Sequence, residues 1–334
     1  MKEAVDCYSL TDDLRQTILP LTKVNPWLGL LRFTLLGTLF FSLVILAWIT
    51  NNQIIFVLTS LLAGFFYALW LICTHDTTHY TLTQWTWFEE IAPRLQSYPL
   101  SWPYGVYQEL HHLHHGWNGF DFRDPERTEW TKDEYETASP WQQWYVKHQW
   151  PIDIFVLGGI GLITRTIAQG VKLRSIRPRL QWKLMTDVVF IVLIHSCFLA
   201  IALSYGVIAR YFLFWFILER TVGFFMQTRE HLEHYQMWTQ KDTYQLTQLY
   251  AARNISVPNW IQWLIGGLPY HSIHHAFPKI PFNHLPEAFD KIQSVLKKHH
   301  YPQMNKENGY VRTAWQLSHQ PSIISSIRGN HTIV

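Results

Sequence analysis

The chain has 334 residues, of which 48% are hydrophobic and only 15% are charged. An average soluble domain carries roughly 25% charged residues, so this composition argues against an ordinary soluble globular protein. The mean hydropathy near zero excludes a chain buried mostly in a bilayer, and the net charge of +3 is too small to indicate a nucleic-acid partner.

The N-terminal part of the chain predicts a cytoplasmic segment followed by a pair of membrane helices. Residues 1–32 lack the basic-then-apolar pattern of a cleaved signal peptide. Apolar runs follow at 33–49 and 54–73, and the uncharged turn TNNQ separates them. Runs of 17 and 20 apolar residues are long enough to span a bilayer. We therefore expect a first transmembrane hairpin over 33–73.

The rest of the chain predicts a second hairpin between two polar segments. Residues 74–185 are expected to be cytoplasmic, and the 12-residue apolar run at 152–163 within them is interpreted as a re-entrant or interfacial helix. Apolar runs at 186–205 and 211–226 predict the second hairpin, over 186–226. Residues 227–334 form the last cytoplasmic segment.

The distribution of basic residues sets the expected orientation. The segment 165–183 is rich in lysine and arginine: Arg165, Lys172, Arg174, Arg177, Arg179 and Lys183. The two expected hairpin turns carry only Arg210 between them. Because basic loops stay on the cytoplasmic side, both termini and the large polar segments are expected there. The fold class is an all-α integral membrane protein, with four transmembrane helices in two hairpins and a cytoplasmic helical cap.

Three histidine clusters, HDTTH, HHLHH and HSIHH, are the main chemical signal in the sequence. Their helical spacing is i, i+4 once and i, i+3, i+4 twice, which confines each cluster to an arc of about 100° on a helix. The residues concerned are His75, His79, His111, His114, His115, His271, His274 and His275. His112 lies off this stripe and is interpreted as a packing or supporting neighbour.

Imidazole at this spacing indicates metal binding. Neutral imidazole suits iron, zinc, copper and nickel. Eight nitrogens exceed what one tetrahedral zinc uses. Two metal ions, each with several nitrogens and an open position for dioxygen, would use them all.

A fourth candidate site is REHLEHY, directly after the last apolar run. Glu230, Glu233 and His234 share one helical arc, whereas His231 lies about 60° outside it. His234 is the preferred ninth ligand and His231 the weaker candidate, with Glu230 as a direct or water-mediated contact. Asp76, Glu233, Asp121 and Asp124 are candidates to accept a hydrogen bond from the outer ring nitrogen of a ligand.

The remaining histidines receive a structural interpretation. His195, in the middle of an apolar run, is expected to be a hydrogen-bonded packing residue. Five isolated histidines are expected to be solvated or loosely packed: His148, His299, His300, His319 and His331. His284 follows the third cluster closely but lacks its spacing, so it is expected to be structural. A zinc-protease helix fits poorly, because Asp76 stands one methylene short of the general-base glutamate.

Taken together, the motifs resemble the integral-membrane fatty acid desaturase superfamily, which includes carotenoid hydroxylases and ketolases, over roughly residues 60–290. HDTTH is similar to the first box of acyl-lipid desaturases and bacterial-type carotenoid hydroxylases, and HHLHHGWNGFDFRDPE resembles the second box. HSIHHAFPKIPFNHLPEAF looks like the third box and following turn of acyl-lipid desaturases. The Glu230–His234 pair resembles the acidic-or-Asn-xxx-His element that precedes the third box.

Three departures narrow the resemblance. The third box opens with His271 rather than glutamine, which argues against a front-end desaturase. The first box has three intervening residues, unlike the acyl-CoA type. An HPGG haem motif is absent from the sequence, so electrons are expected from a separate ferredoxin or cytochrome b5 type donor.

The resemblance implies two iron ions (Fe2+/Fe3+), with dioxygen as co-substrate, held by the eight box histidines with His234 and His231 as further candidates. Glu230 and Asp76 are expected to lie near this cofactor. The reaction implied is removal of hydrogen from an unactivated C–H bond of a lipid acyl chain, in contact with membrane lipids. Two alternatives stay open: a carotenoid or alkyl hydroxylase or ketolase, and a non-catalytic membrane metal-binding protein.

Overall fold

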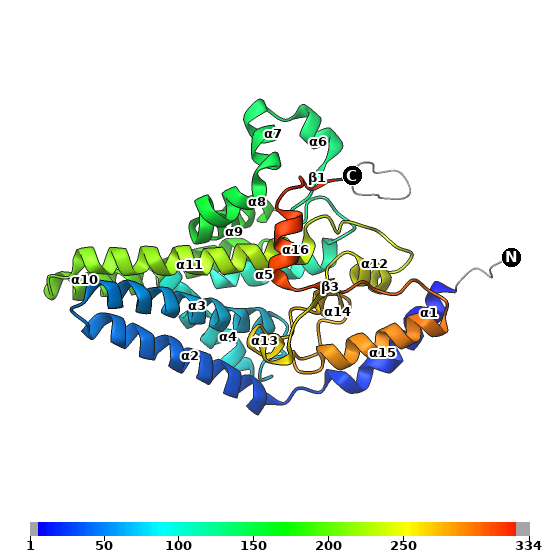
Figure 1. Cartoon of the computed structure of the whole chain (residues 1–334), viewed down its shortest axis with the longest axis horizontal. Helices are drawn as coiled ribbons and strands as arrows, with labels where there is room; N and C mark the ends of the chain where they lie inside the picture. The colour runs from blue at the N-terminus through cyan, green and yellow to red at the C-terminus, as the bar shows by residue number, and fades with distance from the viewer. Residues whose placement is uncertain (1–5, 325–334) are drawn as a thin grey trace. The chain divides into compact units, whose positions relative to one another are not determined.

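The computed structural model describes residues 6–324 and is mostly helical (Figure 1). It divides into two compact units. The first contains the described residues within 1–25, 114–150 and 229–334, and the second contains 26–113 and 151–228. Three of the described helices have residues in both units: α5 (Tyr104–Trp117), α8 (Gln149–Pro151) and α11 (Ile208–His234). The ends of the two terminal segments expected from the sequence, with His331, lie outside the described residues.

In the second unit, α2 (Pro26–Ile49) and α3 (Gln53–Thr78) lie side by side (Figure 1). The side chain of Asn52 accepts hydrogen bonds from the first N–H groups of α3, so the TNNQ turn starts the helix that it precedes. After α3 come α4 (Thr86–Ser97) and the short helix η2 (Tyr98–Leu100). The two apolar runs at 33–49 and 54–73 thus lie in two long, adjacent helices.

A broken helical run follows α8 and lies in the second unit: the π-helical turn η3 (Ile152–Leu157) and α9 (Gly158–Leu173). Gly158 has φ +54°, a conformation that favours glycine. On α11, Glu219 accepts a hydrogen bond from the N–H of Ile160, and Arg220 donates to the carbonyls of Val156 and Leu157. Side chains therefore satisfy the backbone groups that the break leaves open.

Four helical stretches are long and apolar enough to cross a membrane: Pro26–Ile49, Gln53–Thr78, Gln149–Leu173 and Arg179–Ser204, the last being α10. Three agree with the sequence prediction, but the short helix expected at 152–163 is part of a 25-residue stretch. The run predicted at 211–226 lies in α11, which is absent from these four. Its charged residues Arg210, Glu219 and Arg220 lower its hydropathy.

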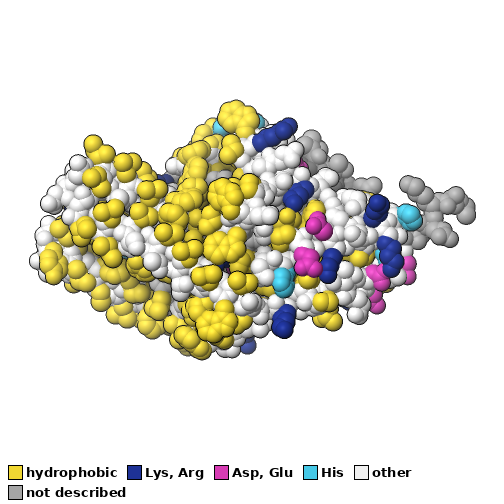
Figure 2. All heavy atoms as spheres, turned by 60° about the horizontal axis from the view of Figure 1, so that its bottom comes forward, with side chains coloured by type: hydrophobic (Ala, Val, Ile, Leu, Met, Phe, Trp, Pro, Cys, Tyr) yellow, Lys and Arg dark blue, Asp and Glu magenta, His cyan; other side chains and the backbone are white. Residues whose placement is uncertain are grey.

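The surface of the second unit is strongly apolar. Only 6% of the most apolar window of α10 is buried inside the molecule. Leucine, isoleucine, valine and phenylalanine side chains of α2, α3 and α10 are exposed, and Figure 2 shows hydrophobic side chains over much of one face of these helices. Exposed apolar surface of this extent marks a lipid-facing region, and the chain is a membrane protein.

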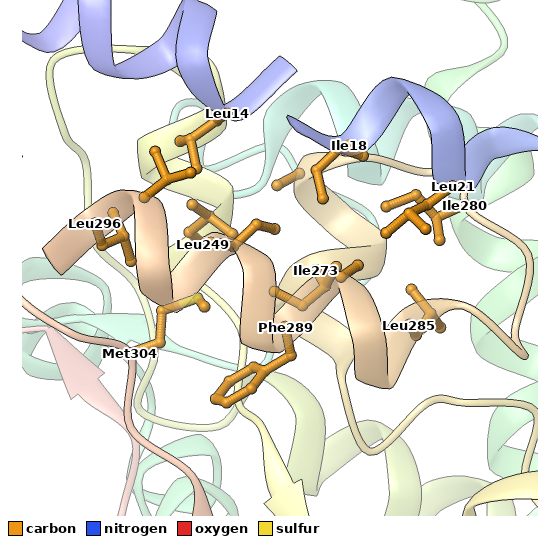
Figure 3. Packing of buried hydrophobic residues seen from close by; sticks show 14 of the residues in the cluster. Leu14, Ile18, Leu21, Leu249, Ile273, Ile280, Leu285, Phe289, Leu296 and Met304 are labelled. Carbon is orange, nitrogen blue, oxygen red and sulfur yellow. The ribbon is translucent and has the colours of Figure 1, made fainter. Parts of the chain in front are cut away.

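The first unit has its own hydrophobic core around α15 (Leu285–Lys298). The buried residues of α15 recur at helical spacing, and α1 (Cys7–Ile18) packs along the same helix (Figure 3). Leu249 of α12 (Tyr244–Tyr250) and Ile273 of α14 (His271–Ala276) join this cluster. The core therefore fixes the short helix that carries the third histidine cluster.

The remaining elements of the first unit are short. They are η1 (Leu19–Thr22), α6 (Lys132–Thr137), α7 (Pro140–Lys147), α13 (Asn259–Leu264) and α16 (Tyr310–Leu317), with strands β1 (Trp130–Thr131), β2 (Ile255–Ser256), β3 (Glu307–Asn308) and β4 (Ile323–Ile324). The strands form two parallel pairs, β1 with β4 and β2 with β3. These pairs tie distant parts of the chain together.

Candidate metal centre

In the second unit, the first histidine cluster meets the start of the second. His75 and His79 lie at the C-terminal end of α3 and its cap, and His111 lies on α5. The ring of His111 is 4.8 Å from that of His75 and 5.2 Å from that of His79. All three are buried, and one nitrogen of each lies within 4.8 Å of the others. This is a set of three imidazoles positioned to hold a metal ion.

Asp76 lies beside this set and is held from another helix. Its Oδ2 accepts a hydrogen bond of 2.8 Å from Arg32 of α2, which is fully buried. Its Oδ1 is 3.6 Å from Nδ1 of His75. The sequence predicted that Asp76 lies near the cofactor. It did not predict Arg32 as the partner of Asp76, because the hydrogen bond between them joins two different helices.

In the first unit, six predicted ligands are buried together. They are His114 and His115 on α5, His234 on α11, and His271, His274 and His275 on α14. Their Nε2 atoms approach one another closely: His114 to His234 at 3.2 Å, His234 to His271 at 2.9 Å, His271 to His275 at 3.1 Å, and His115 to His274 at 3.2 Å.

This donor set fits a metal ion. A ring nitrogen offers one in-plane proton or one lone pair, yet Nε2 of His234 faces both His114 and His271. A cation accepting several lone pairs satisfies such a convergence better than hydrogen bonds between imidazoles. Burial and neighbouring imidazoles lower the pKa of His234 and of His275 well below the usual range, so both are neutral ligands at neutral pH.

Acidic groups give the same site a negative potential. Burial disfavours a charged His114, but Asp124 and Glu126 outweigh it and raise the pKa of His114 to about 9. An environment that stabilises an imidazolium in this way also stabilises a bound cation. Burial raises the pKa of Glu233 to about 8.

Two outer contacts fix the ring orientation of predicted ligands. Nδ1 of His114 is 2.9 Å from both carboxylate oxygens of Asp124, and Nδ1 of His275 is 3.1 Å from Oε1 of Gln248. In each ring Nε2 is then left facing the other histidines. Asp121, also considered from the sequence, pairs with Arg123 instead. Gln248 was missed, because nothing in its local sequence marks it.

The end of α11 contributes to a third set of possible metal-binding residues. Glu233, His234 and His271 form a buried set with one ligand atom each within 4.8 Å of the others. Oε2 of Glu233 is 3.5 Å from Nε2 of His271. Glu230 is buried on the same helix. His231 is also buried but packs between Trp150 and Tyr235, and the three groups found among residues 6–324 do not include it.

Other histidines make ordinary structural contacts. His112 is exposed, and its Nε2 lies 2.9 Å from the carbonyl of Thr78. His195 interacts with Ser101 and Tyr211 within the second unit. His284 and His299 contact Leu21 and Asp13, respectively. The hydrogen bonds of His195 fit the packing role expected from the sequence, whereas His299, expected to be solvated or loosely packed, is partly buried against Asp13.

Buried imidazole clusters together with long apolar helices define a class: a membrane protein with histidine-rich clusters that could hold metal ions. The family model "Fatty acid desaturase" matches residues 51–306, and the chain belongs to this family. It is therefore an oxidoreductase that acts on lipid acyl substrates.

Curated relatives agree with this assignment. A "Fatty acid desaturase" of Bacillus subtilis (strain 168) is 24% identical over 285 residues, which cover 83% of this chain and 78% of the relative. A "Delta 8-(E)-sphingolipid desaturase" of Lachancea kluyveri is 29% identical over 25% of this chain and 16% of its own length. An "Acyl-lipid (9-3)-desaturase" of Borago officinalis is 39% identical over 15% of this chain and 11% of its own length.

Proposed function

We propose that the protein is a membrane-bound, di-iron, O2-dependent desaturase that introduces a double bond into a lipid acyl chain. The histidines of the three clusters, together with His234, are the proposed ligands of two iron ions. The observation that carries this proposal is the convergence of buried imidazole nitrogens at distances of about 3 Å. Imidazole-rich sites of this kind suit iron and leave positions open for a small co-substrate.

The chain's own residues have defined tasks in this proposal. Neutral His234 and His275 offer lone pairs, and the contact of Asp124 with Nδ1 of His114 orients that ring so that its Nε2 faces the other histidines. Burial of all these side chains excludes bulk water from the reacting centre. Bound iron supplies the activation of dioxygen that removal of hydrogen from an unactivated C–H bond requires.

An acyl-lipid substrate is supported by the sequence that follows the third cluster. The FPKIP continuation after HSIHH resembles that of acyl-lipid desaturases, and one relative carries that activity in its name. Electrons are proposed to come from a separate ferredoxin or cytochrome b5 type donor. The termini and the polar segments are proposed to be cytoplasmic, with the basic residues of 165–183 enforcing that orientation.

Lipid analysis tests the proposed reaction. The chain is expressed in a host with a simple saturated and monounsaturated lipid profile, beside a matched His114→Ala variant. A new double bond in one lipid class that the variant lacks is the expected result. A polar carotenoid product from a pigment-producing host would instead assign the chain to the hydroxylases. No change in either lipid or pigment profile would contradict the proposal.

A further inference from the structure

One buried acid in the second unit is not used by the proposed metal centre. Asp187 is the only acidic residue of α10, and α10 is one of the four stretches able to cross a membrane. Only three residues of this helix are buried, and Asp187 is one of them with no exposed surface. An ionisable side chain placed this way needs specific partners, because desolvating a carboxylate is costly.

The partners of Asp187 lie at the start of α5. Its Oδ2 accepts a hydrogen bond of 3.0 Å from the backbone N–H of Val106, and the N–H of Gly105 is a second donor. Its Oδ1 accepts a hydrogen bond of 2.7 Å from the hydroxyl of Tyr98. A Cβ atom at Gly105 would lie 3.0 Å from both carboxylate oxygens. The glycine thus lets the carboxylate reach the end of the helix.

The local sequence explains why α5 takes an acceptor from another helix. Pro103 is the N-cap residue, since its carbonyl accepts the first intrahelical bond, from the N–H of Tyr107. Most helices use an N-cap serine, threonine, aspartate or asparagine to satisfy the N–H groups of the first turn. The proline side chain has no oxygen for this purpose. Asp187 occupies that role from a distant part of the chain, and its charge also favours the N-terminal end of the helix dipole.

We infer that Asp187 is a positioning residue that caps α5 and thereby holds His111, His114 and His115 in place. All three histidines lie on α5, a 14-residue α-helix whose hydrogen bonds fix the position of each residue relative to the others. A shift at its N-terminus is therefore passed to the predicted ligands. This inference rests on the proposed function, because it assigns Asp187 a task in forming the metal centre.

A cap supplied by the helix itself provides the sharpest test. Four proteins are compared as monodisperse, detergent-purified full-length chains: the natural protein, Asp187→Ala, Asp187→Asn and the double variant Asp187→Ala/Pro103→Ser. Iron per chain is measured after equilibration at graded Fe2+ concentrations. The iron affinity of Asp187→Ala is expected to fall about ten-fold, as when an outer support of a ligand is lost.

The other variants separate capping from charge. The Asp187→Asn amide oxygen still accepts from the backbone, so this variant should stay within about three-fold of the natural protein. The double variant should regain most of the lost affinity, because a serine at position 103 accepts from the N–H of Val106 in place of Asp187. If Asp187→Ala alone fails to purify, the inference is tested by comparing the iron affinity of the double variant with that of the natural protein.

Clear outcomes contradict the inference. Iron affinity of Asp187→Ala equal to that of the natural protein would overturn it. So would a double variant that binds no more iron than Asp187→Ala, or an Asp187→Asn variant as poor as Asp187→Ala. Failure of the natural protein to bind iron at all would instead contradict the proposed function, so the two failures are distinguishable.

Discussion

At the scale of single residues, the contact between His114 and Asp124 ties a predicted ligand to a carboxylate on a loop. Asp124→Asn keeps the shape of the side chain but removes its charge, so the ring of His114 is held less firmly. We expect the variant to lose about 10–100-fold in iron affinity or turnover. Asp121→Asn is the matched control, since Asp121 pairs with exposed Arg123. Equal losses in the two variants would contradict the assigned role of Asp124.

The second cluster offers a direct comparison between a ligand and its neighbour. His114→Ala and His274→Ala are expected to abolish turnover while expression stays largely intact, because each removes an imidazole from the buried set. His112→Ala should retain most of the activity, since His112 is exposed and bonds a backbone carbonyl. Product formation in membranes with equal amounts of each variant measures this. Near-normal turnover of His114→Ala would show that it is no ligand.

The buried carboxyl group of Glu89, which lies outside the histidine clusters, predicts that the stability of the protein depends on pH. Glu89 is fully buried, and its Oε1 accepts hydrogen bonds from Thr83 and from the N–H of Gln84. Burial raises its pKa from 4.5 to about 7. Because an acid with a raised pKa binds its proton more tightly in the folded state, its stabilising effect is present at low pH. That effect is lost as the pH rises through about 7.

Glu89→Gln removes this titration. Relative to the variant, the natural protein should lose on the order of 3 kcal/mol of stability between pH 5 and pH 8, the amount that the shift in pKa implies. Thermal unfolding of both proteins in the same detergent at each pH measures the difference. Parallel curves for the two proteins across this range would contradict the raised pKa.

Much of the candidate site was predictable at this scale because the signal is local. The spacing of HxxHH on a helix already places its histidines on one face, and the structure buries all six of the residues so selected. Arg32, Gln248 and Asp187 were not predictable as partners of the site. Their contacts join segments tens of residues apart, and an isolated arginine, glutamine or aspartate carries no spacing pattern.

At the scale of the elements, the close approach of α11 to the start of α9 depends on glycine. A Cβ atom at Gly223 would lie 1.9 Å from the backbone nitrogen of Gly159 and 2.2 Å from the carbonyl carbon of Gly158. Backbone atoms cannot rotate away, so Gly223→Ala forces the two helices apart. We expect a loss of about 2 kcal/mol or more in stability, measured by thermal unfolding.

Gly116→Ala is the control for this prediction. Gly116 lies in α5, and a Cβ atom there meets nothing within 4 Å. Alanine should therefore leave stability unchanged or raise it by at most about 0.5–1 kcal/mol, the gain of alanine over glycine in a helix interior, because Gly116 lies near the end of α5. If Gly223→Ala were as stable as Gly116→Ala, the packing of α11 against the start of α9 would be wrong.

Helix boundaries were harder to predict than helix positions, and the reasons are physical. The run at 152–163 looked too short to span because polar residues flank it, yet helical structure continues through the break at Gly158 to Leu173. Conversely, α11 is long but carries Glu219 and Arg220, whose task is to satisfy the backbone at that break. A hydropathy window counts such charges against a membrane span and does not register that they bond to the backbone inside the molecule.

At the scale of the whole molecule, the proposed orientation makes a testable statement about two loops. Single cysteines are introduced at Asn51, in the TNNQ turn, and at Ser175, in the basic segment, in a chain whose three natural cysteines are replaced. A membrane-impermeant maleimide should label position 51 in intact cells and position 175 only after lysis. Labelling of position 175 in intact cells would reverse the proposed orientation.

The central claim is that the buried histidines hold two iron ions for acyl-chain desaturation. Metal analysis of the purified, monodisperse protein, combined with lipid profiling of the cells that produced it, tests this claim most directly. We predict two irons per chain and a new double bond in a lipid acyl chain. One zinc or copper ion per chain, with an unchanged lipid profile, would contradict it.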